Sequence, residues 1–149
     1  MRKINLIVLH CSATRETMEY TPEQMERDHK ARGFFSAGYN YYIRRSGEVV
    51  PMRPPEQIPA HAKGYNAFSL GICYEGGLDA DGHPKDTRTE RQKLSIRRLL
   101  LLLLVRYPGC RICGHRDLSP DRNGDGKITR DEWLKECPCF DAEEEYGIL

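Results

Sequence analysis

The sequence has 149 residues, of which 39% are hydrophobic and 30% charged, values suited to one folded domain spanning residues 1–149. Its 23 lysines and arginines nearly balance 22 aspartates and glutamates, and the net charge of +1 argues against nucleic acid or an anionic membrane as a partner. The N-terminal apolar run lacks a signal-peptide cleavage site, which predicts synthesis and retention in the cytoplasm. The apolar run 99–105 is far shorter than the ~20 residues that span a bilayer. We therefore expect a monomeric domain without membrane insertion.

The first predicted elements are a strand and a helix. Residues 4–10 form an apolar, β-branched run, typical of a strand that is buried on both faces. Thr21, Pro22 and Gln24 together predict a helix start, because they supply a cap, a first-turn proline and the second half of a capping box. Gly33 predicts the end of this helix.

A hairpin, a long loop and a further strand follow. The pair Ser46-Gly47 predicts a tight turn between strands at 40–45 and 48–51. The proline-rich stretch 52–66 has no hydrophobic period and predicts a long loop, a kind of segment that often carries function. Residues 70–74 predict a short strand.

The second half contains the longest predicted helix. A polar turn at 79–85 precedes a helix at 89–107, which begins with a second capping box formed by Thr89 and Gln92. We expect its apolar block 99–104 to be buried all round. Residues 110–113 predict a last short strand, and 131–136 a final helical turn or two. Strands that alternate with helices around a buried first strand indicate an α/β domain with a mixed central β-sheet flanked by helices.

Residues 121–132 match the twelve-residue calcium loop D-x-[DN]-x-[DN]-G-x5-E at every specified position. Gly126 allows the sharp turn, and oxygen ligands would come from Asp121, Asn123, Asp125, Lys127 (by its backbone carbonyl) and Glu132. The simpler alternative is a solvated acidic turn without metal. The segment before the loop is not helical, so the loop is not a full helix–loop–helix hand. We expect a structural Ca2+ that orders the approach to Lys135 and Cys137.

Three further residues have side chains suited to zinc. His10 ends the first strand, His115 directly follows the last one, and Cys137 follows the calcium-type loop. Two imidazoles and a thiolate, with a fourth position left for water, resemble a catalytic zinc site. Spacing alone does not establish this set, because about a hundred residues separate the two histidines.

The six cysteines allow other interpretations. Two closely spaced pairs, Cys110 with Cys113 and Cys137 with Cys139, could supply four thiolates to a structural zinc site. A disulfide among them would require an oxidising compartment. Cys11 and Cys73 lie in predicted strands and are expected in the core.

Six further stretches of the sequence form an ordered set of motifs: 10–14 (HCSAT), 38–43 (GYNYYI), 61–66 (HAKGYN), 69–73 (SLGIC), 114–117 (GHRD) and 135–141 (KECPCFD). In this order they resemble the type 2 family of N-acetylmuramoyl-L-alanine amidases, which includes phage lysozyme-type amidases and peptidoglycan recognition proteins. The resemblance therefore covers nearly the whole chain. The family usually joins the positions of His115 and Lys135 by a much shorter segment, and the calcium-type loop occupies most of the extra length here.

The resemblance implies a role for each matching residue. His10, His115 and Cys137 match the zinc ligands. Tyr39 matches the tyrosine that faces the zinc-bound water, and Lys135 matches the lysine that stabilises the transition state. His61 and Asn66 match positions near the substrate cleft, where they would contact substrate.

The implied reaction is zinc-dependent hydrolysis of the amide that joins the lactyl group of N-acetylmuramic acid to L-alanine in peptidoglycan, so the expected site of action is the bacterial cell wall, as for an endolysin. The main alternative is a non-catalytic peptidoglycan-binding module of the same fold, although such members typically lose the zinc cysteine. The phage relatives also prompt a third interpretation, an interaction protein that inhibits a polymerase.

Overall fold

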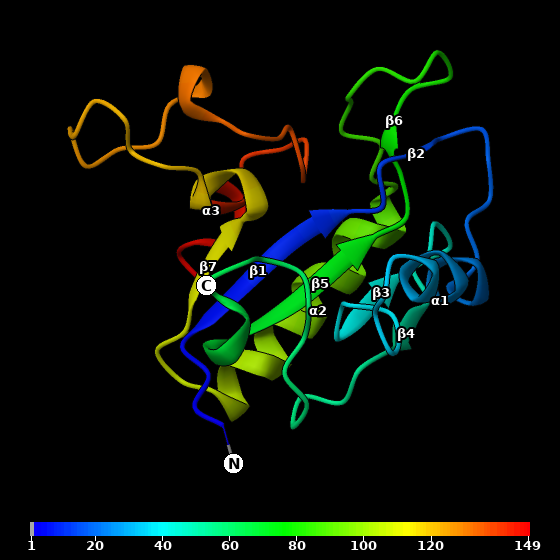
Figure 1. The fold of residues 1–149 in the computed structure, drawn as a ribbon, viewed down its shortest axis with the longest axis horizontal. Coiled ribbons are helices and arrows are strands. Elements are labelled where there is room, and N and C mark those ends of the chain that lie inside the picture. Colours follow the sequence, from blue (N-terminus) through cyan, green and yellow to red (C-terminus); the bar gives the residue numbers. More distant parts are fainter. Residues whose placement is uncertain (1) are drawn as a thin grey trace.

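A five-stranded mixed sheet forms the centre of the molecule in the computed structural model, which describes residues 2–149 (Figure 1). The strand order is β4-β3-β5-β1-β7, with only β3 and β4 antiparallel. These strands are β1 (Leu6–Cys11), β3 (Tyr41–Ile43), β4 (Val49–Pro51), β5 (Ser69–Tyr74) and β7 (Arg111–Gly114). A separate parallel pair, β2 (Thr14–Arg15) and β6 (Gly77–Leu78), extends beyond β1 and β5. The predicted mixed central sheet is confirmed.

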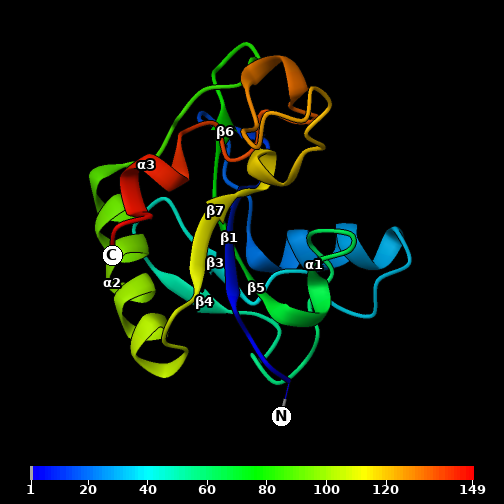
Figure 2. The ribbon, with the colours of Figure 1, turned by 90° about the vertical axis from the view of Figure 1, so that its left-hand side faces the viewer.

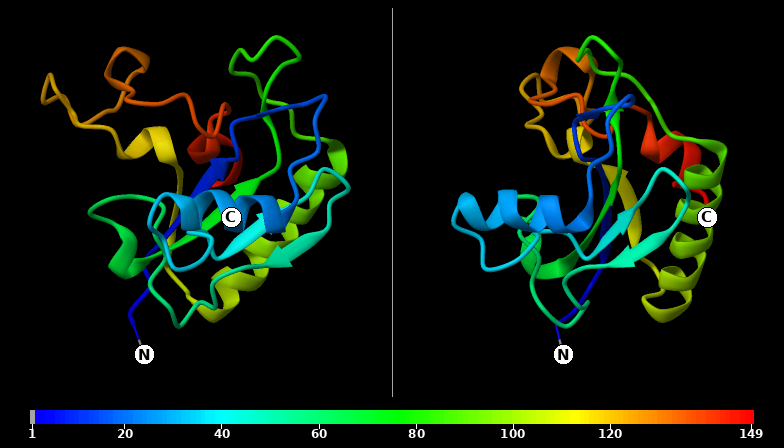
Figure 3. Two further views of the ribbon diagram at one scale, coloured as in Figure 1. Left: turned by 45° about the vertical axis from the view of Figure 1, so that its right-hand side comes forward. Right: turned by 90° about the vertical axis from the view of Figure 1, so that its right-hand side faces the viewer.

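Helices cover both faces of the sheet. Helix α1 (Pro22–Ala31) lies on one face and α2 (Glu90–Arg106) on the other (Figures 2 and 3). Both predicted capping boxes are present, from Thr21 to Gln24 and from Thr89 to Gln92. A short helix, α3 (Ala142–Tyr146), follows near the C-terminus, and three 3-10 segments are η1 (Asn66–Phe68), η2 (His115–Leu118) and η3 (Arg130–Glu132). The described residues hold no helix long and apolar enough to cross a membrane.

Side-chain alternation divides β1 between the two faces. Ile7 and Leu9 belong to the main core with the buried face of α2, and Cys11 shares their side, as expected. Leu6 and Val8 pack in a smaller cluster on the opposite face, the face that carries His10 at the end of the strand. One side of the strand therefore builds the core, while the other ends in a functional side chain.

The leucine-rich half of α2 departs from expectation. Leu100 and Leu103 are buried, but Leu102 is 69% exposed and Val105 83% exposed. A helix that packs on one face of a sheet buries only one stripe of side chains, so the predicted all-round burial is wrong. Of the helical turns predicted at 131–136, the structure contains only η3. No helix was predicted at the position of α3.

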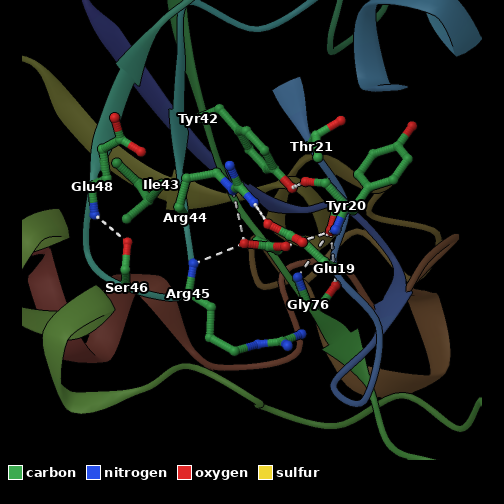
Figure 4. A network of polar contacts seen from close by, with 12 residues as sticks. Glu19, Tyr20, Thr21, Tyr42, Ile43, Arg44, Arg45, Ser46, Glu48 and Gly76 are labelled. Carbon is green, nitrogen blue, oxygen red and sulfur yellow. Dashed lines mark hydrogen bonds and ion pairs between the residues drawn. The ribbon is translucent and has the colours of Figure 1, made fainter. Parts of the chain in front are cut away.

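A network of polar contacts joins Tyr20, Arg44 and Arg45 to the end of β5 (Figure 4). Glu75 is 2% exposed and accepts hydrogen bonds from the backbone N–H groups of Tyr20 (2.7 Å) and Arg45 (2.8 Å) and from Arg44 Nε (3.0 Å). Burial alone would raise its pKa, but these donors together hold the pKa of the Glu75 carboxyl below its usual value. The contact ties the segment before α1 and the turn between β3 and β4 to the end of β5.

Candidate metal centre and its cleft

Three side chains predicted to bind metal converge at the carboxyl end of the parallel strands. One ligand atom from each of His10, His115 and Cys137 lies within 4.8 Å of the others, and His10 Nδ1 is 3.9 Å from Cys137 Sγ. His10 lies within β1 and His115 directly follows the adjacent β7. Neighbouring parallel strands end at the same edge of a sheet, which explains why residues so distant in sequence meet here.

The chain returns to this edge to deliver Cys137. The backbone N–H of Cys11 donates to Cys137 Sγ (3.2 Å), and the N–H of Arg116 donates to the Cys137 carbonyl (2.9 Å). Gly114 allows the close approach, because a Cβ at this position would lie 2.6 Å from Pro138 Cδ. Backbone contacts thus hold the thiol beside both imidazoles.

The electrostatics suit a metal cation with neutral imidazole ligands. Burial lowers the pKa of His10 well below its usual value, helped by the nearby His61, His115 and Lys135. Burial, with a contribution from Lys135, lowers the pKa of His115 to about 4. Both rings are therefore neutral at pH 7, and each keeps a lone pair for coordination. The set of two nitrogens and one sulfur fits Zn2+ with an open fourth position.

The two residues expected to act in catalysis lie around the three ligands. The Tyr39 and His10 ring centroids are 5.0 Å apart, and burial raises the pKa of the Tyr39 phenol well above its usual value, so this hydroxyl is protonated at neutral pH. Lys135 is exposed and lines two adjoining cavities of about 270 and 420 Å³, which also share His61 and His115. Together these cavities form one cleft across the metal centre.

The structure places the two expected substrate residues differently. His61 lines both cavities, yet its ring is hydrogen-bonded to His10 (His61 Nδ1 to His10 Nε2, 2.7 Å). Asn66 does not line either cavity. Its Oδ1 accepts hydrogen bonds from the backbone N–H groups of His61 (2.9 Å) and Ala62 (3.0 Å), so its side chain shapes the loop.

One cleft residue was not identified from the sequence. From its place on the first predicted helix, His29 would be expected at the surface. It is instead 8% exposed and lines the larger cavity, and its Nδ1 accepts a hydrogen bond from the Gly38 N–H (2.8 Å). The sequence feature that could have indicated this burial is the spacing of His29 from Met25. Residues four apart lie on one helix face, and Met25 is buried against the sheet.

The calcium-type loop brings its carboxylates together. One oxygen from each of Asp121, Asp125 and Glu132 lies within 4.8 Å of the others. Within the loop, Asp121 accepts from the N–H groups of Gly124 and Gly126, and the buried Glu132 accepts from those of Arg122 and Thr129. The Asn123 and Asp125 side chains likewise accept N–H groups two residues ahead. The loop therefore has an ordered turn that is stabilised by its own side chains.

The remaining thiols do not form a second zinc site. All six cysteines are free, and the described residues contain no cluster of four thiols. Cys113 packs under β1 with Leu6 and Val8, whereas the Cys110 Sγ donates to the Ile4 carbonyl near the opposite end of β7. The four-thiolate interpretation is therefore wrong, because Cys113 packs on one face of the sheet, while the other three thiols pack against the main core on the opposite face. Cys73 is fully buried, as expected.

Known proteins are similar to this chain in sequence and in fold. The profile of the N-acetylmuramoyl-L-alanine amidase family matches residues 1–132. An endolysin of Klebsiella phage KP32 is 37% identical over 135 residues, which are 91% of this chain and 80% of the relative. The N-acetylmuramoyl-L-alanine amidase LysC from Clostridium intestinale superposes with a TM-score of 0.72 at 27% identity, covering 97% of this chain and 82% of that one. A peptidoglycan recognition protein complex solved with tracheal cytotoxin has a TM-score of 0.70 at 25% identity, covering 93% and 77%. The chain belongs to the N-acetylmuramoyl-L-alanine amidase family.

Proposed function

We propose that this protein is a zinc-dependent amidase that hydrolyses the bond between the lactyl group of N-acetylmuramic acid and L-alanine in peptidoglycan. The observation that carries the proposal is the convergence of His10, His115 and Cys137 beside a cleft that is also lined by Tyr39 and Lys135. Family membership and the endolysin relatives support peptidoglycan as the substrate. We infer that the bacterial cell wall is the site of action.

Each residue of the cleft has a chemical task in this reaction. Zinc, when bound by His10, His115 and Cys137, supplies Lewis-acid activation of water and of the scissile carbonyl. The Lys135 ammonium extends into the cleft, where it can donate a hydrogen bond to the carbonyl oxygen as negative charge develops there. The protonated Tyr39 hydroxyl can donate a hydrogen bond that orients the reacting groups.

Metal analysis combined with a wall-digestion assay tests this function. We expect one zinc per chain in the native protein and release of peptides from purified cell walls. Cys137→Ala or His10→Ala should abolish that release, whereas Cys110→Ala, a thiol remote from the cleft, should retain it. Full activity in the Cys137→Ala protein would exclude the zinc mechanism.

The alternative of a non-catalytic binding module makes a different prediction. Zinc-loaded wild-type protein would then sediment with cell walls and release no peptide. The presence of all three ligands favours the enzyme, since a binding module has no need of an intact ligand set for catalysis.

We also propose that residues 121–132 bind one structural calcium ion. Support comes from the complete loop spacing and from the grouping of Asp121, Asp125 and Glu132. Isothermal titration of chelator-treated protein should show one binding event, and Asp125→Ala should weaken it. No heat of binding in the wild-type protein would favour the solvated turn without metal.

A further inference from the structure

The buried ring of His10 has a partner at each nitrogen. Nδ1 faces Cys137 Sγ at 3.9 Å, and Nε2 lies 2.7 Å from His61 Nδ1. A neutral imidazole carries one N–H, so the ring can coordinate through Nδ1 only if Nε2 carries the hydrogen and donates it to His61. His10 is 1% exposed, which leaves solvent little opportunity to replace that acceptor.

The hydrogen-bond chain extends beyond His61 to Ser69. If His61 accepts at Nδ1, its own hydrogen is on Nε2, which lies 2.8 Å from the Oγ of Ser69. Ser69 is fully buried at the start of β5 and can accept this hydrogen bond. The three side chains therefore form a directional chain from the metal centre into the sheet, with His10 as donor to His61 and His61 as donor to Ser69.

Neighbouring residues hold His61 in this position. Asn66 Oδ1 accepts hydrogen bonds from the backbone N–H groups of His61 and Ala62, which fixes the backbone of the loop that carries the His61 ring. Gly71 leaves room for the ring itself, because a Cβ at that position would lie 2.8 Å from His61 Cγ. A side chain that is held by its backbone, its far nitrogen and the strand beneath it is preorganised as an acceptor.

We propose that His61, held by Ser69, is a positioning residue that sets the tautomer and orientation of the metal ligand His10. The proposal rests on the zinc function proposed above and gives His61 a task other than direct substrate binding. Partners that orient a metal-ligating histidine in this way typically change metal affinity by about 10- to 100-fold when they are removed. The contribution of Asn66 and Gly71 is to place His61.

Zinc affinity is the first test. In competition with a chromophoric chelator, His61→Ala should weaken zinc binding by about 10- to 100-fold. His61→Asn keeps an acceptor at the position of Nδ1 and should recover most of that loss, while Ser69→Ala should show a smaller decrease. Cys110→Ala, at a thiol remote from the cleft, is the control and should bind zinc as the wild type does. Circular dichroism of each metal-free variant checks that it is folded.

The tautomers give a readout that does not depend on zinc or on activity. Long-range 1H–15N spectra of metal-free wild-type protein at pH 7 should show hydrogen on Nε2 of both His10 and His61. Hydrogen on Nδ1 of His10, or unchanged zinc affinity in His61→Ala, would overturn the proposal. Wild-type protein that binds no zinc would refute the proposed function, while the tautomer spectra would still decide the hydrogen-bond chain. If His61→Ala does not fold, Ser69→Ala and the wild-type spectra decide it.

Discussion

Replacing Glu75 by glutamine should destabilise the fold, because this carboxylate has three donors and almost no contact with water. The exchange preserves volume but replaces one acceptor oxygen by an NH2 group. If the remaining oxygen faces Arg44 and Arg45, the new NH2 faces the Tyr20 N–H and leaves that buried donor unpaired. The charge-assisted bond to Arg44 is weakened as well.

The size of the loss follows from the two groups affected. An unsatisfied buried donor costs about 1–3 kcal/mol, and breaking a fully buried ion pair costs about 3–5 kcal/mol. The Arg44 side chain is 16% exposed and keeps a second partner in Glu19, so the ion-pair value is an upper limit. We therefore expect a loss of about 2–4 kcal/mol, equivalent to a decrease in Tm of roughly 5–15 °C for a domain of this size.

Urea unfolding of wild-type and Glu75→Gln protein measures this difference. Glu19→Gln is the matched control, because this partner is 73% exposed and surface pairs contribute at most about 1 kcal/mol. The folded-state pKa of Glu75 is lowered, so its stabilisation is present above the unfolded pKa of about 4.3 and is lost as pH falls through the folded value. The difference in unfolding free energy between wild-type and Glu75→Gln protein should therefore become smaller as the pH falls. A Glu75→Gln protein that is as stable as the Glu19→Gln protein would refute this account. A free-energy difference between wild-type and Glu75→Gln protein that stays constant from pH 7 to pH 3 would also refute it.

Three other changes test the cleft. Lys135→Ala should lower turnover by about 100- to 1000-fold through loss of charge stabilisation while zinc content stays at one per chain, and loss of zinc would instead indicate a structural role. Tyr39→Phe removes only the hydroxyl and should lower the rate of peptide release by roughly 100-fold, since the proton of that hydroxyl is expected to act in the reaction. The Tm of this variant should be unchanged. Activity equal to that of the wild type would exclude the role. Gly114→Ala should reduce both Tm and zinc affinity, because its Cβ would meet Pro138 and displace Cys137; chelator competition and thermal unfolding measure the two effects, and unchanged values would contradict the packing argument.

Local signals in the sequence predicted most elements correctly. Thr21 and Thr89 start their helices with the predicted capping boxes, and the Ser46-Gly47 turn joins the predicted hairpin. These features depend on residues within a few positions of one another, so short patterns contain the necessary information. The apolar run of β1 likewise predicted a strand that is buried on both faces, and all six residues of β1 are buried.

Features that depend on packing were not predictable in this way. Exposure of Leu102 depends on which stripe of α2 meets the sheet, and the pattern of an all-apolar block does not specify that stripe. The importance of Glu75 was not visible either, because its donors come from two segments distant in the chain.

By itself, the sequence determined the fold class, the family resemblance and the identity of the residues suited to a metal. It could not establish that His10, His115 and Cys137 meet, since about a hundred residues or more separate His10 from the other two and no local period relates them. The three side chains come together because β1 pairs in parallel with β7 and because the backbone N–H of Cys11 donates to the Cys137 thiol. The tertiary structure also decided the place of His61, because a hydrogen bond between side chains 51 positions apart exists only once β1 and the loop before β5 lie side by side.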